Sequence, residues 1–252
     1  MGTGTSQGVP VIGCDCTVCR SDDLRNHRLR TSALIQAGEK NIAIDCGPDF
    51  RQQMLRNGVR SLEAILLTHE HNDHVIGLDD VRPFNFQSQQ DMPIYATPAV
   101  ASEVRQRFAY AFSENKYPGA PSMRFEYIDK DHPFKVAGVP VIPIEVMHGN
   151  LPVLGFRIGD FVYLTDIKTI SDRELEKVRG AKVLAIGVLH HTSHYSHLSV
   201  EEAIRLAESI RPEQTWFIHI SHNMGLYEAV SAELPEGIGL AYDGLKVKIE
   251  GV

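Results

Sequence analysis

The feature that most constrains this chain is a short histidine-rich segment, Thr68-His69-Glu70-His71-Asn72-Asp73-His74. It follows residues 63–68, whose apolar run predicts a buried β-strand, so it lies in a loop at a strand's end. Binding and catalytic residues tend to be placed in such loops. Imidazole and carboxylate groups suit zinc, manganese or iron. The order H-x-H-x-D-H therefore predicts a site for two metal ions with these ligands: His69, His71, Asp73 and His74.

Composition limits the fold class. The chain has 252 residues, of which 43% are hydrophobic and 23% charged, as in ordinary globular proteins. This length suits one large domain or two small ones, and no linker divides it, so we expect a single domain over residues 1–252. Predicted strands cluster in both halves with helices between them. This pattern indicates an α/β (α+β) protein with two β-sheets sandwiched by helices.

The predicted elements follow from apolar alternation and from turn and cap signals. Strands are predicted over residues 31–37, 41–46, 63–68, 93–96, 124–129, 134–136, 139–146, 153–158, 161–165, 182–188 and 215–220. Helices are predicted over residues 48–57, 97–112, 171–178, 199–210 and 223–234. The tail over residues 237–250 is expected to add one or two strands.

Net charge, cysteine content and the length of the apolar runs limit the partners and the cellular compartment that we expect. The net charge of −7 disfavours a protein that binds nucleic acid mainly by electrostatics. Four cysteines in a chain of this length do not form a disulfide framework, so we expect reduced thiols in a cytoplasmic protein. No apolar run is long enough to span a bilayer and no signal peptide opens the chain, so no membrane partner is expected.

Three of the cysteines form a tight cluster, Cys14-Asp15-Cys16-Thr17-Val18-Cys19. Thiolates at this spacing suit a structural zinc, which requires four ligands in a closed tetrahedron. Two residues elsewhere in the chain are candidates for the fourth ligand, Cys46 and His222.

Together these motifs resemble the metallo-β-lactamase superfamily. Along the whole chain they are most similar to its PhnP-type (phosphoribosyl) cyclic phosphate phosphodiesterases. Besides the two clusters above, the resemblance rests on Gly2-Thr3-Gly4-Thr5-Ser6, Asp45-Cys46-Gly47-Pro48-Asp49-Phe50-Arg51, Gly77-Leu78-Asp79-Asp80-Val81-Arg82-Pro83, Ser196-His197-Leu198-Ser199 and His219-Ile220-Ser221-His222. It implies a four-layer αββα sandwich.

The resemblance also implies how the ligands are shared. One active-site metal is expected to take His69, His71 and His148, and the second to take Asp73, His74 and His219. Asp166 is expected to bridge them. The structural zinc is expected to take Cys14, Cys16, Cys19 and His222, which leaves Cys46 as a small core residue on a strand.

The expected chemistry is hydrolysis. Two metals roughly 3.5–4 Å apart share a hydroxide formed at neutral pH and neutralise charge on the substrate oxygens, so Asp73 is expected to be essential. The resemblance makes His197 catalytic, either as a proton donor to the leaving alkoxide or as a cation beside the transition state. Three residues are candidate substrate contacts: His194, Arg51 and Arg82. For the arginines, bidentate binding of a phosphate competes with a network of aspartates and arginines that braces the metal loop.

The resemblance implies a dinuclear-metal phosphodiesterase that opens a small cyclic phosphate, such as a ribosyl 1,2-cyclic phosphate. Zinc, manganese or iron would occupy the active site, with one further structural zinc, and the default assembly is a homodimer. One alternative is a ribonuclease Z-like nuclease, which the acidic charge and the lack of an evident basic arm disfavour. Another is a non-catalytic metal-binding relative of the pyrroloquinoline-quinone biosynthesis type, which the intact H-x-H-x-D-H loop disfavours.

One feature departs from the resemblance. Similar chains begin with a strand that leads into the Gly-Thr-Gly loop, whereas here Met1 directly precedes Gly2. We expect either a truncated start or a fold without this edge strand, and a weaker sheet edge at this point.

Overall fold

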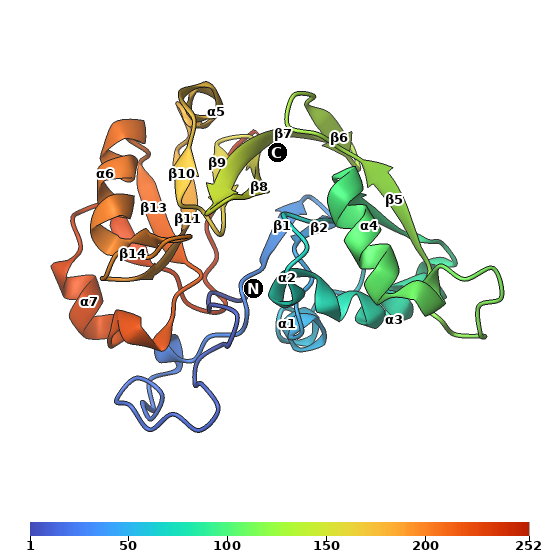
Figure 1. Ribbon diagram of the computed structural model, residues 1–252, viewed down its shortest axis with the longest axis horizontal. Helices are drawn as coiled ribbons and strands as arrows, with labels where there is room; N and C mark the ends of the chain where they lie inside the picture. The colour runs from blue at the N-terminus through green and yellow to red at the C-terminus, as the bar shows by residue number, and fades with distance from the viewer. Residues whose placement is uncertain (252) are drawn as a thin grey trace.

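Strands with alternating apolar side chains build the first of two sheets in the computed structural model, which describes residues 1–251 (Figure 1). This sheet has the order β1-β2-β3-β4-β5. Its strands are β1 (Ala33–Ala37), β2 (Lys40–Ile44), β3 (Ala64–Leu66), β4 (Met92–Ala96) and β5 (Met123–Tyr127). β1 and β2 form an antiparallel hairpin, and β2 to β5 run parallel to one another. The first sheet therefore presents the carboxyl ends of four strands at one edge.

The second sheet contains the remaining strands, with the path β10-β7-β8-β9-β11-β13-β14. They are β6 (Phe134–Val136), β7 (Val139–His148), β8 (Leu151–Ile158), β9 (Phe161–Leu164), β10 (Thr169–Ile170), β11 (Val183–His190), β12 (Leu198–Ser199), β13 (Gln214–Ile218) and β14 (Ile238–Leu240). β6, β7, β8 and β9 are joined antiparallel, whereas β9, β11, β13 and β14 run parallel. The carboxyl ends of β9, β11 and β13 thus also meet at one edge.

Seven α-helices cover the outer faces of the two sheets (Figure 1). They are α1 (Phe50–Arg56), α2 (Asn72–Val75), α3 (Arg82–Ser88), α4 (Pro98–Arg107), α5 (Asp172–Val178), α6 (Val200–Ile210) and α7 (Tyr227–Glu233). α1 to α4 pack on the first sheet and α5 to α7 on the second. α6 begins with the predicted capping box, in which Ser199 and Glu202 bond each other's backbone.

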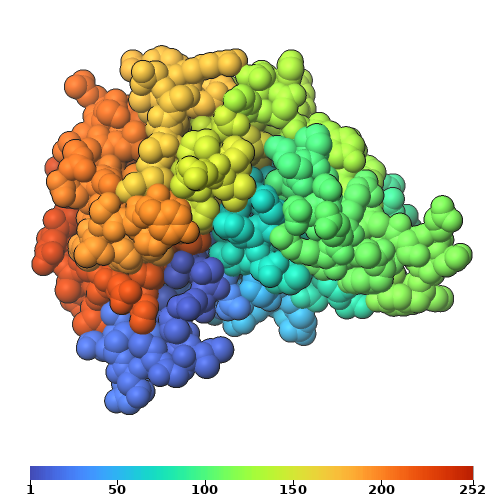
Figure 2. Space-filling view, viewed as in Figure 1, coloured from blue at the N-terminus to red at the C-terminus, as the bar shows by residue number. Residues whose placement is uncertain are grey.

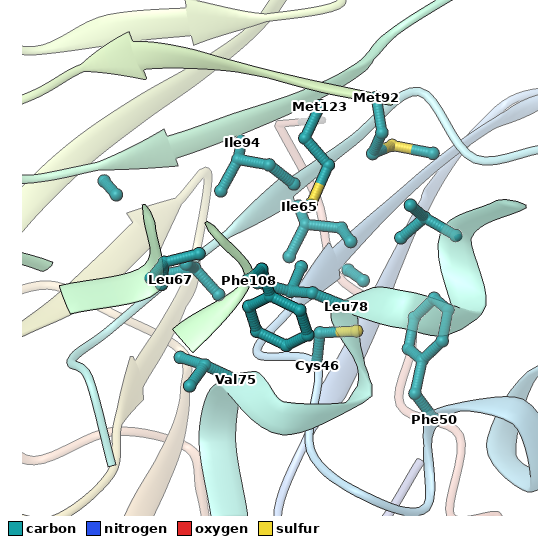
Figure 3. Packing of buried hydrophobic residues seen from close by; sticks show 14 of the residues in the cluster. Cys46, Phe50, Ile65, Leu67, Val75, Leu78, Met92, Ile94, Phe108 and Met123 are labelled. Atoms are coloured by element: carbon teal, nitrogen blue, oxygen red, sulfur yellow. The ribbon is translucent and has the colours of Figure 1, made fainter. Parts of the chain in front are cut away.

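Three apolar cores separate these layers. Because side chains alternate along a strand, Ile42 and Ile44 of β2 pack between the sheets while Ala43 packs toward the helices. Figure 3 shows the core between the first sheet and its helices, where Cys46 lies beside Phe108 and Leu78. The order helix, sheet, sheet, helix confirms the predicted four-layer αββα fold.

The predicted hairpin and most strands and helices are confirmed, with shifted ends. The helix predicted over residues 97–112 ends at Arg107, because the buried Phe108 leaves helical backbone angles. The helix predicted over residues 223–234 is split, because Gly225 adopts a φ of 101°. β7 extends through His148, beyond its predicted end at residue 146.

The segment from Asn72 to β4 was predicted to begin as a loop, with no helix, and is largely helical. It contains α2, a 3₁₀ helix over Ile76–Val81, and α3. Pro83 lies at the start of α3, where its fixed φ and missing N–H are tolerated. That proline was the available sequence signal for this helix.

The amino-terminal residues join the sheets only through isolated bridges. Gly2 pairs with Ser32, and Gly4 pairs with both Arg30 and Ile220. Upstream of β1, the described residues form no strand. The described part of the chain also contains no helix long and apolar enough to cross a membrane.

The core between the sheets gives a stability prediction. Phe156 of β8 is fully buried there, so Phe156→Ala should lower the free energy of unfolding by about 3–5 kcal/mol. Phe86→Ala is the matched control, because Phe86 is 61% exposed, and should change it by less than about 0.5 kcal/mol. Urea unfolding monitored by circular dichroism measures both. Equal losses would contradict this assignment of the core.

Candidate metal centres

Strand ends from both sheets bring the predicted active-site ligands together. The histidine loop follows β3 of the first sheet, while His148 ends β7 of the second. Asp166 follows β9 and His219 follows β13. In Figure 2 the segments that carry these residues meet near the centre of the face shown. There the teal loop after β3 lies next to the yellow turn after β7 and the dark blue amino-terminal segment.

His69, His71 and His148 form one side of the cluster. Nε2 of His69 lies 3.0 Å from Nδ1 of His71. The ring of His148 lies 5.4 Å from that of His71 and 6.0 Å from that of His69, between centroids. Two ring nitrogens this close suit a shared cation, as predicted for the first metal.

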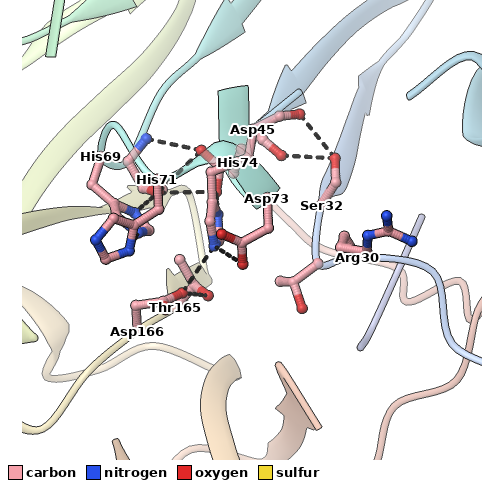
Figure 4. Close-up of polar contacts among 12 residues, drawn as sticks. Arg30, Ser32, Asp45, His69, His71, Asp73, His74, Thr165 and Asp166 are labelled. Carbon is pink, nitrogen blue, oxygen red and sulfur yellow. Dashed lines mark hydrogen bonds and ion pairs between the residues drawn. The ribbon is translucent and has the colours of Figure 1, made fainter. Parts of the chain in front are cut away.

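His74 lies between three carboxylates (Figure 4). Its Nδ1 is 2.7 Å from Asp45, and its Nε2 is 3.3 Å from Asp73 and 3.2 Å from Asp166. Burial alone would lower the pKa of His74, but Asp166 and Asp45 raise it well above its ordinary value. His74 thus joins the histidine loop both to the first sheet and to the strand end that carries Asp166.

His219 approaches the same carboxylates from the far side of His74. Its Nε2 lies 3.3 Å from Asp166 and 3.6 Å from Asp73, and its ring stacks on that of His74 at 5.7 Å. Burial alone would raise the pKa of Asp166, but His219 and His74 lower it well below its usual range. Asp166 touches both imidazoles, which is the position expected of a bridging ligand.

Buried nitrogen atoms without partners test whether metal ions fit this cluster. Nε2 of both His74 and His219 is buried and has no hydrogen-bond partner among the described residues. Buried polar atoms are normally satisfied, and these two nitrogens face carboxylate oxygens. A pair of divalent cations between them would satisfy nitrogen and oxygen together, so the donor set fits the predicted metals.

In three of the ligand rings the Nδ1 nitrogen already has a hydrogen-bond partner. Nδ1 of His74 bonds Asp45, Nδ1 of His148 donates to the Ser196 carbonyl at 2.9 Å, and Nδ1 of His69 lies 2.9 Å from the Thr68 hydroxyl. Such bonds set the tautomer and leave Nε2 free for a metal.

Asp45 is the residue at this site that the sequence reasoning missed. It follows β2, is fully buried, and accepts bonds from His74 and from both the N–H and the hydroxyl of Thr68. It therefore fixes a ligand and the start of the histidine loop at once. The available signal was a carboxylate directly after an apolar strand, in the Asp45-Cys46-Gly47 motif.

Left-handed backbone marks three of these strand ends. Asp45, Asp166 and His219 have φ values of 64°, 49° and 57°, which non-glycine residues rarely adopt. Such strain persists only where the surroundings fix it, and it concentrates at functional sites. Here it occurs at the residues that turn their side chains into the cluster.

His197 lies beside the cluster. Its ring is 4.5 Å from that of His148 and 5.0 Å from that of His219. Burial, helped by His219, lowers the pKa of His197 to about 3. His197 also forms a possible ligand trio with His148 and Asp166, whose donor atoms lie within 4.8 Å of one another, and this trio was not predicted.

The candidate substrate residues lie in different surroundings. His194 is half-buried, and its ring is 5.2 Å from that of His197. Arg82 is paired with Asp79, which favours the bracing network over phosphate binding. Arg51 is exposed on α1, and among the described residues neither arginine bonds the histidine cluster.

The cysteine cluster forms a second centre with His222. Nδ1 of His222 lies 3.2, 3.5 and 3.6 Å from the sulfurs of Cys14, Cys16 and Cys19. Ligands of a tetrahedral zinc with ordinary Zn–S and Zn–N bonds are about 3.6 Å apart. The backbone N–H of Cys19 lowers the pKa of Cys16 to about 6, which favours the thiolate that binds zinc.

Cys46 lies elsewhere. It is fully buried in the core between the first sheet and its helices, where burial raises the pKa of its thiol well above the usual value (Figure 3). The structure thus places His222, and not Cys46, with the three clustered cysteines.

The cysteine centre gives a matched pair of variants. Cys16→Ala should lose about one zinc per chain and unfold at a lower temperature. The three ligands that remain cannot complete the tetrahedral coordination of a structural zinc. Cys46→Ala should keep its full zinc content. Elemental analysis and thermal melts of both purified proteins provide the measurement. A fully folded Cys16→Ala protein that melts like the parent would contradict a structural role for the zinc.

Asp45 gives a second prediction. Asp45→Asn keeps the side-chain shape but removes the charge that fixes His74, so affinity for active-site metal should fall by roughly 10–100-fold. Titration of metal occupancy against a chelator measures the change. Asp160→Asn is the control, because among the described residues the Asp160 carboxylate pairs with Lys182 and with none of the proposed metal ligands. Equal metal affinities in both variants would remove Asp45 from the site.

Two curated proteins are similar to this chain in sequence. The chain is 44% identical to a protein named octanoyltransferase from Porphyromonas gingivalis, over 99% of this chain but only 51% of that protein. It is 30% identical to a ribonuclease Z from Bradyrhizobium diazoefficiens, over 52% of this chain and 44% of that protein. The chain therefore spans about half the length of these curated relatives.

One solved structure is similar to this chain over almost the whole length of both. It is described as a new diphosphatase from the PhnP family, with 38% identity and a TM-score of 0.91, covering 98% of this chain and 94% of that one. A sequence profile described as the beta-lactamase superfamily domain matches residues 40–220. The chain therefore belongs to the beta-lactamase superfamily and has the metallo-β-lactamase fold.

Proposed function

We propose that this protein is a dinuclear-metal phosphodiesterase that opens a small cyclic phosphate. The observation that carries the proposal is the convergence of five imidazoles and two carboxylates from both sheets on one point: His69, His71, His74, His148, His219, Asp73 and Asp166. The superfamily is one of hydrolases, and the donor set suits two divalent ions such as zinc, manganese or iron.

The metal ions and the side chains of the protein have separate roles in the proposed reaction. When bound, the two ions supply a water-derived nucleophile at neutral pH and neutralise charge on the phosphate oxygens. Asp45, Ser196 and Thr68 hold the ligand rings in fixed tautomers. Asp166 lies against both His74 and His219 and keeps the two halves of the site at a constant separation.

His197 is proposed to act on the leaving oxygen. Its pKa of about 3 makes the ring neutral at pH 7 in the free protein. A phosphate bound beside it brings negative charge, which favours the protonated ring and raises this pKa. His197 can then donate its proton to the departing alkoxide, or remain charged beside the phosphate. Both roles proposed from the sequence therefore require the substrate to be present.

The similar diphosphatase structure supports a second candidate substrate. A diphosphate linkage and a cyclic phosphodiester share the same reacting group, a phosphorus atom attacked by water with an oxygen as leaving group. The same metals and the same histidine can serve both. A small diphosphate compound is therefore the second candidate beside the ribosyl 1,2-cyclic phosphate.

The two curated relatives suggest competitors for the same site. An octanoyl thioester and a precursor tRNA correspond to the names of those relatives, each of which is about twice as long as the region it shares with this chain. The net charge of −7 disfavours the tRNA. A cytoplasmic homodimer completes the proposal and rests on the family resemblance.

A substrate panel tests the proposal. Metal-loaded protein should hydrolyse ribosyl 1,2-cyclic phosphate, with a small diphosphate next in kcat/KM, and should leave octanoyl thioester and precursor tRNA unchanged. Phosphate release, thioester absorbance and gel analysis provide the measurements. Turnover of the tRNA or the thioester alone would overturn the phosphodiesterase assignment.

Two variants test the roles within the site. Asp73→Ala should abolish turnover of every substrate, because it removes a ligand. At full metal loading, His197→Ala should lower kcat by roughly 10²–10⁴-fold. His132→Ala is the matched control, because His132 is exposed beside Asp129, and it should be fully active. An unchanged rate in His197→Ala would remove that residue from the mechanism.

A further inference from the structure

A large aromatic side chain is exposed beside the metal cluster. Tyr195 lies in the loop over residues 191–197, between β11 and β12, and 82% of its surface is exposed. The same loop carries His197 and the candidate substrate residue His194. Single exposed apolar side chains are common on protein surfaces, so the position of Tyr195 decides whether it has a role.

Contacts on two sides place Tyr195 at the rim of the candidate active site. Its ring lies over Gly149, the residue after the proposed ligand His148, and a Cβ at Gly149 would be 3.5 Å from Cε2 of this ring. The ring of His194 lies 4.8 Å from that of Tyr195 and 5.2 Å from that of His197, between centroids. The three rings of this loop therefore form a series that leads from the surface to the metal cluster.

Hydrogen bonds on both sides of Tyr195 hold the loop in place. Nε2 of His191 lies 2.9 Å from the Met224 carbonyl. On the other side, the Ser196 carbonyl accepts the bond from Nδ1 of His148. A surface whose backbone is fixed in advance loses less conformational freedom when a ligand binds to it. The exposed ring of Tyr195 is therefore presented by a pre-organised loop.

His194 has a nitrogen available for a ligand. Among the described residues, both hydrogen bonds of its ring go to Nδ1, from the N–H of Ser196 at 3.3 Å and from its hydroxyl at 3.2 Å. Because a backbone N–H can only donate, Nδ1 is the acceptor and the neutral ring carries its proton on Nε2. This N–H can donate to an oxygen of a sugar that lies between His197 and Tyr195.

We propose that Tyr195 and His194 form an aromatic platform that binds the nucleobase of a nucleotide substrate. A base can stack on any aromatic side chain without matched hydrogen bonds, and the open face of Tyr195 leaves the polar edge of the base in water. The two steps from His197 to Tyr195 correspond to the one sugar that separates base and phosphate in a nucleotide. The inference rests on the proposed function and adds the substrate class to it. Tyr195 determines specificity and takes no part in the reaction.

Equilibrium binding tests the platform without turnover. Metal-loaded protein should bind adenosine 5′-monophosphate about tenfold more tightly than ribose 5-phosphate, because only the nucleotide carries a base. Tyr195→Ala should remove this difference, and Tyr195→Phe should keep it. Tyr127→Ala is the matched control, because Tyr127 is 61% exposed on β5 and should leave the difference unchanged. Isothermal titration calorimetry provides the measurement.

Steady-state kinetics connects the platform to the substrate. Tyr195→Ala should lower the ratio of kcat/KM for a nucleoside 2′,3′-cyclic phosphate to that for ribosyl 1,2-cyclic phosphate by about tenfold, through KM rather than kcat. An unchanged ratio would overturn the inference even in an active phosphodiesterase.

Two further results would overturn the platform. One is equal affinity for the two monophosphates, or binding of neither. The other is a change of oligomeric state in Tyr195→Ala, measured by sedimentation, since the ring would then belong to an interface between copies of the chain. If the nucleotide bound in a Tyr195-dependent way and no phosphodiester were hydrolysed, the platform would be supported and the proposed reaction would be overturned.

Discussion

The structure depends on a buried imidazole shared by its two sheets. His74 bonds Asp45 of the first sheet through one nitrogen and faces Asp166 of the second through the other. Three carboxylates and their histidines lie close together in an interior where unpaired charge is costly. Divalent cations bound among these groups would balance this array. Such ions would then also join the edges of the two sheets.

The candidate metal ligands were easier to predict from the sequence than the residues and helices that hold them in place. The H-x-H-x-D-H order was informative because its ligands are neighbours in the chain and follow one strand. Asp45 was not predicted as part of the site, because its role depends on β2 lying parallel to β3, which places it against Thr68 and His74. The helices between the loop and β4 were missed because the packing of Leu78 and Phe84 on the first sheet, rather than a long periodic pattern, stabilises them.

Asp45 and Cys46 are neighbours in the chain whose side chains lie in different surroundings. Asp45 follows the end of β2 and has a left-handed φ of 64°, so the backbone turns away from strand geometry at this point. Asp45 turns into the metal cluster, and Cys46 turns into the helix-covered core. Composition alone made Cys46 a reasonable zinc ligand. Its position immediately after the carboxylate that bonds His74 sends its thiol away from the other cysteines, which His222 can reach because it lies just beyond His219.

The sign of the charge at the active site follows from the same arrangement. The net charge of −7 includes the carboxylates of the cluster, and burial lowers the pKa of both His69 and His197, whereas Asp166 and Asp45 raise that of His74. Of the two candidate arginines, Arg82 is paired with Asp79. A phosphate would meet a field of its own sign in the protein alone. Under the proposed function, divalent ions would supply the attraction for the substrate as well as the chemistry, so metal loading would affect substrate binding and turnover together.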